Sequence, residues 1–404
     1  MSRQAIINLK SSIKNMDLDP RFQQIYLRKP TLHVRAPGRV NLLGEHVDYN
    51  DGMVLPVALD RAVYLAAVPT GDDIVTLQAL DLGETASFCV DQVATKGDLQ
   101  GHPLPGWALY PAGVAWALQE AGLEITGAQV AYTSQVPIGA GLSSSAAVEV
   151  AFAALWRATG GWLVDNLNLA RLCQRAENHY VGVACGLMDQ FASACGVEGH
   201  ALYFDTRSLE WEPLPLPPET VIVIADSGVR RSLASSAYNE RRQACEQAVE
   251  ILRTYLPEIT ALRDVSPPEF AAYSTFLPPV VARRAEHIVK EIARVGSAVR
   301  ALQRQDAHIF GALMYAGHAS LRDLYEVSTP ELDALVEIAR GLPGCYGARL
   351  TGAGFGGCTV NLVNEGDAKG FIQALSTAYL QRTGRQAQVF LCRASAGVEV
   401  KPAD

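Results

Sequence analysis

A glycine- and serine-rich segment in the first half of the chain has the composition of a phosphate-binding turn. It contains Pro137, Gly139, Ala140, Gly141, Leu142, Ser143, Ser144 and Ser145. Glycines let successive backbone N–H groups point into one hollow, and the start of the helix expected next adds unpaired donors and a positive dipole end. One serine hydroxyl could also ligate Mg²⁺. An ordinary glycine turn with serine N-caps would explain the same residues, and the segment is not a Walker A loop.

A second segment, Arg35–Asn50, places three polar side chains in one short turn. The turn begins at Gly44, which is followed by Glu45, His46 and, after one further residue, Asp48. Each hydroxyl of a sugar both donates and accepts hydrogen bonds, so this density of polar groups suits sugar binding. A metal site built on His46 is a competing interpretation, although one histidine supports it weakly. A third interpretation is a solvated turn that binds no ligand.

A third segment, Cys185–Phe191, sets Asp189 among apolar residues shortly after Gly186. A buried carboxylate is costly unless it is paired, so we expect a cation such as Arg39 beside it. The two residues would form a general base with its partner. A helix N-cap aspartate is an equally common explanation of the pattern.

A fourth segment, Leu350–Cys358, has four glycines within six residues between two apolar runs. This many glycines allows another backbone or a phosphate to approach closely. An elaborate hairpin loop is the alternative.

The elements around these segments must bring them together. Strand-like stretches separated by Gly and Pro favour a mixed or antiparallel sheet in the first part of the chain. A further strand precedes the phosphate turn, and a buried helix follows it. The expected strands are Thr31–Ala36, Met53–Val57, Ala62–Val68, Ile74–Ala79 and Ala128–Gln135, and the expected helix is Ser143–Arg157.

A cluster of prolines at 213, 215, 217 and 218 suggests a domain boundary near residue 215, because proline continues neither helix nor strand well. We therefore divide the chain into 1–215 and 216–404. The second part begins as α and ends as α+β. Its expected strands are Val221–Ala225, Gly347–Thr351, Cys358–Val363 and Gln388–Arg393, and its expected helices are Ala234–Tyr255, Val281–Leu302, Ala307–Leu324, Thr329–Arg340 and Asp367–Thr383.

Composition limits the possible partners. The 404 residues carry a formal charge of −8, which gives no general attraction for nucleic acid. The eight cysteines form no CxxC pair and indicate reduced thiols in a cytoplasmic protein. The start, Met1–Lys14, lacks the pattern of a secretion signal, and no apolar run is long enough to span a membrane.

Taken together, the segments resemble the three signature motifs of the GHMP small-molecule kinases, and the first in chain order is similar to the galactokinase signature. Gly38–Asn50, Pro137–Ala147 and Thr351–Gly357 stand in the order of that family. Similar stretches at Ala176–Gln190 and Ser232–Arg242 extend the resemblance over nearly the whole chain. The resemblance implies a two-domain α+β fold. Its N-terminal domain would have a mixed sheet with a left-handed βαβ-type phosphate-loop region, and its C-terminal domain would be ferredoxin-like.

The resemblance also implies an activity and residue roles. It implies an ATP-dependent kinase for the C1 hydroxyl of galactose that uses Mg²⁺. We expect the protein to be a monomer. Asp189 would face that hydroxyl, with Arg39 between it and the phosphate. The sugar-binding residues would be Glu45, His46, Asp48, Gly186 and Tyr238. The loop from Pro137 to Ser145 and Gly354 would bind ATP phosphates, Trp107 and Tyr110 would lie near adenine, and Ser145 (or Ser144) and Glu177 would serve Mg²⁺.

Several positions depart from the galactokinase pattern. Val47 stands where threonine is usual, which could change the tolerance for a modified sugar. Pro111 and Ala112 alter the segment after Trp107 on the adenine side. Ala140 and Ala353 replace usual glycines, which is tolerable only if neither position needs positive φ. A kinase for a related sugar such as N-acetylgalactosamine is therefore the close alternative. A non-catalytic sugar- and ATP-binding regulator is a second, although Arg39, Asp189 and Ser143–Ala147 are all present.

Overall fold

The computed structural model describes residues 18–230 and 234–403. The segment Met1–Lys14 and the start of the Ser232–Arg242 stretch, Ser232 and Leu233, lie outside the described residues. Among the described residues, no helix combines the length and the hydrophobicity needed to span a bilayer.

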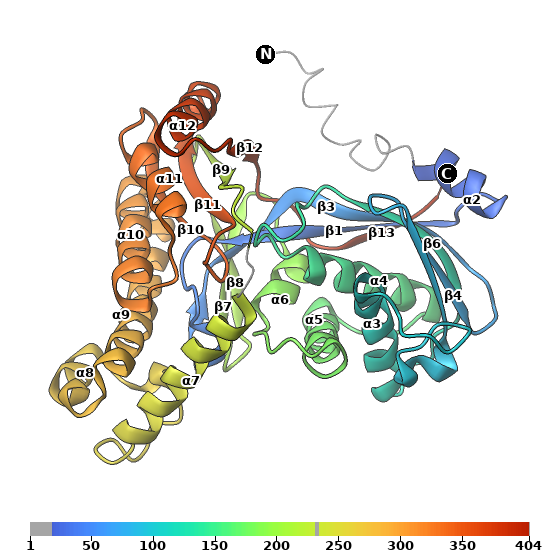
Figure 1. Cartoon of the computed structure of the whole chain (residues 1–404), viewed down its shortest axis with the longest axis horizontal. Coiled ribbons are helices and arrows are strands. Elements are labelled where there is room, and N and C mark those ends of the chain that lie inside the picture. The colour runs from blue at the N-terminus through green and yellow to red at the C-terminus, as the bar shows by residue number, and fades with distance from the viewer. Residues whose placement is uncertain (1–17, 231–233, 404) are drawn as a thin grey trace.

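A six-stranded sheet forms the frame of the first half of the chain (Figure 1). Its order is β13-β1-β3-β6-β4-β5, and the pair β4 and β6 is parallel. The strands are β1 (Leu32–Asn41), β3 (Pro56–Pro69), β4 (Ile74–Ala79), β5 (Glu84–Cys89), β6 (Ala128–Ser134) and β13 (Glu399–Pro402). The last strand of the chain therefore returns to pair with β1.

Both faces of this sheet are covered, which explains why β3 is apolar along nearly its whole length. Val63, Leu65 and Ala67 face the main core, where they meet the helices. The alternate residues Tyr64 and Ala66 pack with α2 on the other face. The helices are α2 (Leu18–Tyr26), α3 (Leu109–Glu120), α4 (Ser144–Gly160), α5 (Asn166–Arg175), the π-helical turn η4 (Ala176–Val181) and α6 (Met188–Cys195).

The second half is built on a four-stranded antiparallel sheet of order β10-β11-β9-β12, flanked by long helices on the left of Figure 1. The strands are β9 (Thr220–Asp226), β10 (Cys345–Leu350), β11 (Cys358–Asn364) and β12 (Gln388–Cys392). The helices are α7 (Ala234–Leu252), α8 (Pro267–Tyr273), α9 (Pro279–Gln303), α10 (Ala307–Ser320), α11 (Pro330–Arg340) and α12 (Ala368–Thr383).

A small three-stranded sheet joins β2 (Met53–Val54), from the first part of the chain, to β7 (His200–Asp205) and β8 (Trp211–Pro215), which lie between the two parts in sequence. Strand β8 includes Pro213 and Pro215, two of the four prolines from which the domain boundary was inferred. They are accommodated because β8 is an edge strand, where a missing N–H costs little. The domain division near residue 215 stays a prediction.

The predicted α+β fold with a mixed sheet and a ferredoxin-like second half is confirmed. One boundary differs in a way that matters for the site. The first strand was expected to stop at Ala36, yet β1 continues through Pro37 and Gly38 to Asn41, with a register shift between Pro37 and Arg39. This bulge re-aims the strand. It leaves Arg39 facing the cavity described below.

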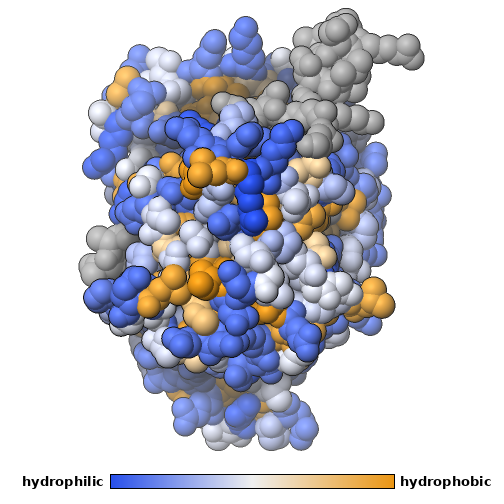
Figure 2. Space-filling view, turned by 90° about the vertical axis from the view of Figure 1, so that its right-hand side faces the viewer, coloured by the Kyte–Doolittle hydropathy of each residue, from blue (hydrophilic) through white to orange (hydrophobic). Residues whose placement is uncertain are grey.

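The molecular surface in Figure 2 is the face at the right of Figure 1, and there hydrophobic side chains are scattered among hydrophilic ones. Within the described residues, none of the eight cysteines forms a disulfide.

Candidate active site

A cavity of about 520 Å³ opens where the two halves of the chain meet. It collects side chains from all four segments singled out in the sequence. The lining residues with polar or charged groups are Arg39, Glu45, His46, Asp48, Ser143, Ser144, Ser145, Glu177, Cys185, Asp189, Arg230, Tyr238 and Asn239.

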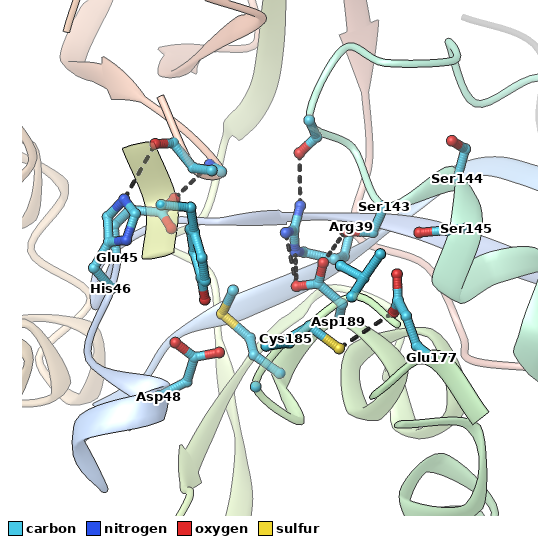
Figure 3. Close-up of a pocket in the computed structure, with 18 of the residues that line it drawn as sticks. Arg39, Glu45, His46, Asp48, Ser143, Ser144, Ser145, Glu177, Cys185 and Asp189 are labelled. Carbon is cyan, nitrogen blue, oxygen red and sulfur yellow. Dashed lines mark hydrogen bonds and ion pairs between the residues drawn. The ribbon is translucent and has the colours of Figure 1, made fainter. Parts of the chain in front are cut away.

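The pair Arg39 and Asp189 lies at the centre of this cavity (Figure 3). Arg39 Nε and Nη2 lie 2.8 Å and 2.7 Å from Asp189 Oδ1, and Arg39 Nη1 donates to the carbonyl oxygen of Gly141. Ser143 Oγ donates to Asp189 Oδ2 at 2.5 Å. The guanidinium is buried, whereas the carboxylate is 27% exposed. Asp189 is thus held on both oxygens and remains open to a ligand.

The phosphate-loop segment turns as its glycines require. Gly139 and Gly141 have φ of +71° and +85°, and Ser143 has φ of +58° just before α4 begins at Ser144. Gly38 allows β1 to approach this loop, because a Cβ there would lie 2.7 Å from the carbonyl oxygen of Leu142. The first turn of α4 therefore presents its free N–H groups beside the serine hydroxyls, an arrangement suited to an anion.

Glu177 lies across the cavity from the sugar-type residues, on the same side as Ser144 and Ser145 (Figure 3). It comes from the π-helical turn η4, and its carboxylate accepts from Gln190 Nε2 at 2.6 Å. Burial, followed by the nearby charge of Asp189, raises the pKa of Glu177 to about 7, and hydrogen bonds from Cys185, Gln190 and Ser145 oppose that rise. The carboxylate is thus desolvated next to a serine hydroxyl.

Glu45 ties the sugar-type turn to the glycine loop of the second half. Its Oε1 accepts from Thr351 Oγ1 at 3.1 Å and from the backbone N–H of Gly352 at 2.8 Å. Burial raises the pKa of Glu45, and the charges of Arg349 and Arg39 oppose that rise.

Asp48 and His46 continue this side of the cavity. Burial, then the charges of Asp189 and Glu45, raise the pKa of Asp48 to about 7. His46 Nδ1 lies 2.8 Å from the hydroxyl of Tyr49, and its ring packs 5.6 Å from that of Tyr238. Val47, by contrast, is fully buried in the main core. The valine in place of the usual threonine therefore acts on packing under the turn.

Related proteins align with this chain over almost its full length. A galactokinase of Roseiflexus sp. (strain RS-1) is 48% identical over 382 residues, which cover 95% of this chain and 96% of that protein. The chain belongs to the galactokinase family. A galactokinase of Chloroflexus aurantiacus is 46% identical and covers 93% of this chain and 95% of its own length.

Family models and a solved structure agree with this membership of the galactokinase family. The model of the galactokinase galactose-binding signature matches residues 20–69. Those of the GHMP kinase N-terminal and C-terminal domains match residues 110–197 and 298–381. The structure of Lactococcus lactis galactokinase complexed with galactose superposes with a TM-score of 0.89 at 33% identity, covering 95% of this chain and 98% of that one. The chain is accordingly an ATP-dependent sugar kinase of the GHMP fold.

Some residues predicted for this galactokinase-family site do not line the cavity. Ala140 and Leu142 belong to the loop, but their side chains are buried in the protein. Gly354 packs against Val327, and Gly352 and Ala353 reach the cavity in its place. Neither Ala140 nor Ala353 has positive φ, so both alanines are free of backbone strain. Pro137 is half-buried outside the lining.

The adenine-side residues also stand apart from the cavity lining. Trp107 Nε1 donates to Glu84 at 2.6 Å, and the Trp107 ring lies 6.1 Å from that of Tyr132. Burial raises the pKa of Tyr110 to about 12, and the nearby carboxyl groups of Glu177 and Glu149 contribute to that rise. Their adenine contacts stay predictions.

Two features of the site were missed in the sequence. Arg230 lines the cavity and forms a paired contact with Asp226, at 2.8 Å and 3.0 Å. Nothing in the sequence after β9 distinguishes this arginine. The other feature is Glu149, which is fully buried beneath the phosphate loop. A charged residue within the apolar run of α4 was a visible signal for it.

Proposed function

We propose that this chain transfers the γ-phosphoryl group of ATP to the C1 hydroxyl of α-D-galactose, giving α-D-galactose 1-phosphate and ADP. The observation that carries the proposal is the position of the Arg39–Asp189 pair. It lies between Glu45, His46 and Asp48 on one side and Ser143–Ser145 on the other, within a single cavity (Figure 3). A sugar hydroxyl and a terminal phosphate bound on these two sides would meet at Asp189.

In the reaction, the C1 oxygen forms a bond to the γ-phosphorus while the bond from that phosphorus to the β,γ-bridging oxygen breaks. Asp189 accepts the hydroxyl proton. Phosphoryl transfer of this kind depends on alignment and charge neutralisation more than on covalent help. Arg39 supplies positive charge at the centre, and the N-terminus of α4 supplies N–H donors to the phosphates.

Mg²⁺ fits the residues on the phosphate side. Glu177 and Ser145 provide a carboxylate and a hydroxyl, both hard oxygen ligands, on the same side of the cavity (Figure 3). Among the described residues, no group of three or more His, Cys, Asp or Glu side chains could hold a metal ion. Two protein ligands suit an ion that keeps several waters and binds substrate phosphates. When bound there, Mg²⁺ would neutralise charge on the transferred phosphoryl group.

Galactose would lie against Glu45, His46, Asp48, Gly186 and Tyr238. Glu45 and Asp48 offer acceptors, and the tyrosine hydroxyl offers both roles. Because Val47 is buried in the core, the departure from the family at this position gives no support for an N-acetylated sugar.

ATP phosphates would lie on the loop from Pro137 to Ser145, close to Gly354, with adenine toward Trp107 and Tyr110. We also propose that the protein is a cytoplasmic monomer. The eight cysteines, none of which forms a disulfide among the described residues, and the mixed hydrophilic face in Figure 2 support these two points.

The test is turnover with Mg·ATP and a panel of galactose, N-acetylgalactosamine, glucose, arabinose and mevalonate, followed by ADP release. We expect galactose to be the preferred substrate. Preference for another sugar would reject the substrate, and binding of galactose and ATP without ADP release would indicate a regulator.

A further inference from the structure

A buried polar network lies beneath the phosphate loop, and the proposed reaction leaves part of it unexplained. Glu149 on α4 and Gln190 on α6 are both fully buried. Gln190 Nε2 donates to Glu149 Oε2 at 3.0 Å and to Glu177 Oε2 at 2.6 Å. One amide nitrogen therefore uses both of its hydrogens to join two carboxyl groups on different elements.

Two oxygens of this network have no hydrogen-bond partner among the described residues. They are Glu149 Oε1 and Gln190 Oε1. A buried oxygen without a donor is costly, and two in one contact need an explanation. As ordinary carboxylate and amide oxygens, both are acceptors and cannot satisfy each other.

The surroundings of Glu149 offer no compensating positive charge within the described residues. Burial raises the pKa of Glu149 well above its usual value, and the charges of Glu177 and Asp189 raise it further. The Cys173 thiol nearby adds no charge, because burial, followed by Glu149 and Glu177, raises its pKa well above the usual value.

A proton on Glu149 resolves the contact. A carboxylic acid and a primary amide form a double hydrogen bond when the amide N–H donates to one acid oxygen and the acid O–H donates to the amide oxygen. The first of these bonds is present at 3.0 Å. A hydrogen on Oε1 of Glu149 would complete the second and would give partners to both unpaired oxygens at once.

We propose that Glu149 is a neutral carboxylic acid paired with the Gln190 amide, and that this pair fixes the N–H that Gln190 donates to Glu177. Glu149 is thus a positioning residue. It prevents the amide from turning its oxygen toward Glu177, where two acceptors would repel each other. The metal-binding part of this inference rests on the proposed function.

The first test is infrared difference spectroscopy of the metal-free protein at mildly alkaline pH, comparing the full-length chain with Glu149→Gln. We expect a C=O stretching band of a protonated carboxylic acid in the wild type that shifts in D₂O and is missing from the variant. Absence of this band would overturn the proposal, whatever the substrate of the enzyme is.

The second test uses Mn²⁺ as a probe and measures its binding, in the presence of a non-hydrolysable ATP analogue, by electron paramagnetic resonance. Glutamine at position 149 can make the same double hydrogen bond to Gln190, so Glu149→Gln should bind Mn²⁺ within about twofold of the wild type. Glu149→Leu and Gln190→Met break the pair and should weaken binding about 10- to 100-fold, the usual cost of losing the support of a metal ligand.

The matched control is Glu177→Gln, which removes the proposed ligand itself. If Glu149→Gln weakens Mn²⁺ binding as much as Glu177→Gln, Glu149 acts as a charged group and the proposal is wrong. If Glu149→Leu does not fold, Gln190→Met carries the same prediction. The sugar panel tests the proposed function separately, because none of these readouts depends on which sugar is phosphorylated.

Discussion

Gly186 and Asp48 come from segments far apart in the chain and lie in contact at the cavity wall. A Cβ added to Gly186 would stand 1.8 Å from Asp48 Oδ2 and 2.4 Å from its Cγ. The absence of a side chain at position 186 therefore sets the position of the Asp48 carboxyl.

Gly186→Ala should displace Asp48 and raise the KM for galactose about tenfold or more, with the KM for ATP nearly unchanged. Gly370→Ala in α12 is the matched control, because a Cβ there meets nothing within 4 Å. Steady-state kinetics with each substrate varied in turn gives the answer. An unchanged KM for galactose would remove Asp48 from the sugar site.

Asp189→Asn should lower kcat about 10²- to 10⁴-fold, because the amide cannot accept the hydroxyl proton. Asparagine can still accept from Arg39 through its Oδ1 and can donate from its Nδ2 to the Ser143 hydroxyl, so binding of a non-hydrolysable ATP analogue should stay close to that of the wild type. Calorimetric titration measures that binding. A variant that keeps most of its kcat would show that Asp189 is not the base.

The sequence motifs were sufficient to predict the residues of the site that belong to those motifs. Glu45, His46, Asp48, Arg39 and Asp189 were expected together, and all five line one cavity. The resemblance to the GHMP small-molecule kinases was the reason to expect these residues in one site. No periodicity in the chain could have placed residue 39 beside residue 189.

The parts that escaped prediction depend on tertiary contacts. Proline and glycine at 37 and 38 indicated the end of a strand, yet pairing with β3 carries β1 through them as a bulge. Arg230 reaches the cavity because the glycine loop supports its segment, with Gly357 N–H donating to the Val229 carbonyl. Glu149 was visible as a charge in an apolar helix, but its partner Gln190 lies on another helix.

Arg230→Gln should raise the KM for ATP about tenfold to a hundredfold, the worth of one charge-assisted hydrogen bond. In the described part of the chain, the arginines that line the cavity are Arg39, paired with Asp189, and Arg230, paired with Asp226. Glutamine can still donate to the buried Asp226. Arg242→Gln, at a partly exposed arginine paired with Glu246, is the control and should not change this KM. Equal KM values for both variants would contradict a phosphate contact.

Glu291→Leu should lower the free energy of unfolding by about 3–5 kcal/mol, because it leaves the fully buried Arg349 without its partner. Glu291 also accepts from the backbone N–H of Gly44 at 2.9 Å, just before the sugar-type turn. The neighbouring Lys290 makes a more exposed pair with Glu286, and Lys290→Ala should cost less than about 1 kcal/mol. Urea unfolding of both variants measures the difference. Similar losses would mean that the buried pair does not anchor the turn.

Asp48→Asn should stabilise the sugar-free protein by an amount that grows with pH. Burial, with Asp189 and Glu45, raises the folded-state pKa of Asp48 from 3.8 to about 7. The stabilisation that the wild type gains from this group is therefore complete below the unfolded value and is lost as pH rises toward 7. Asparagine cannot ionise, so its advantage in unfolding free energy should be small near pH 4, increase through the interval and level off above 7. Urea titrations across this range test it, and an advantage that does not vary with pH would show that Asp48 is not desolvated in the empty site.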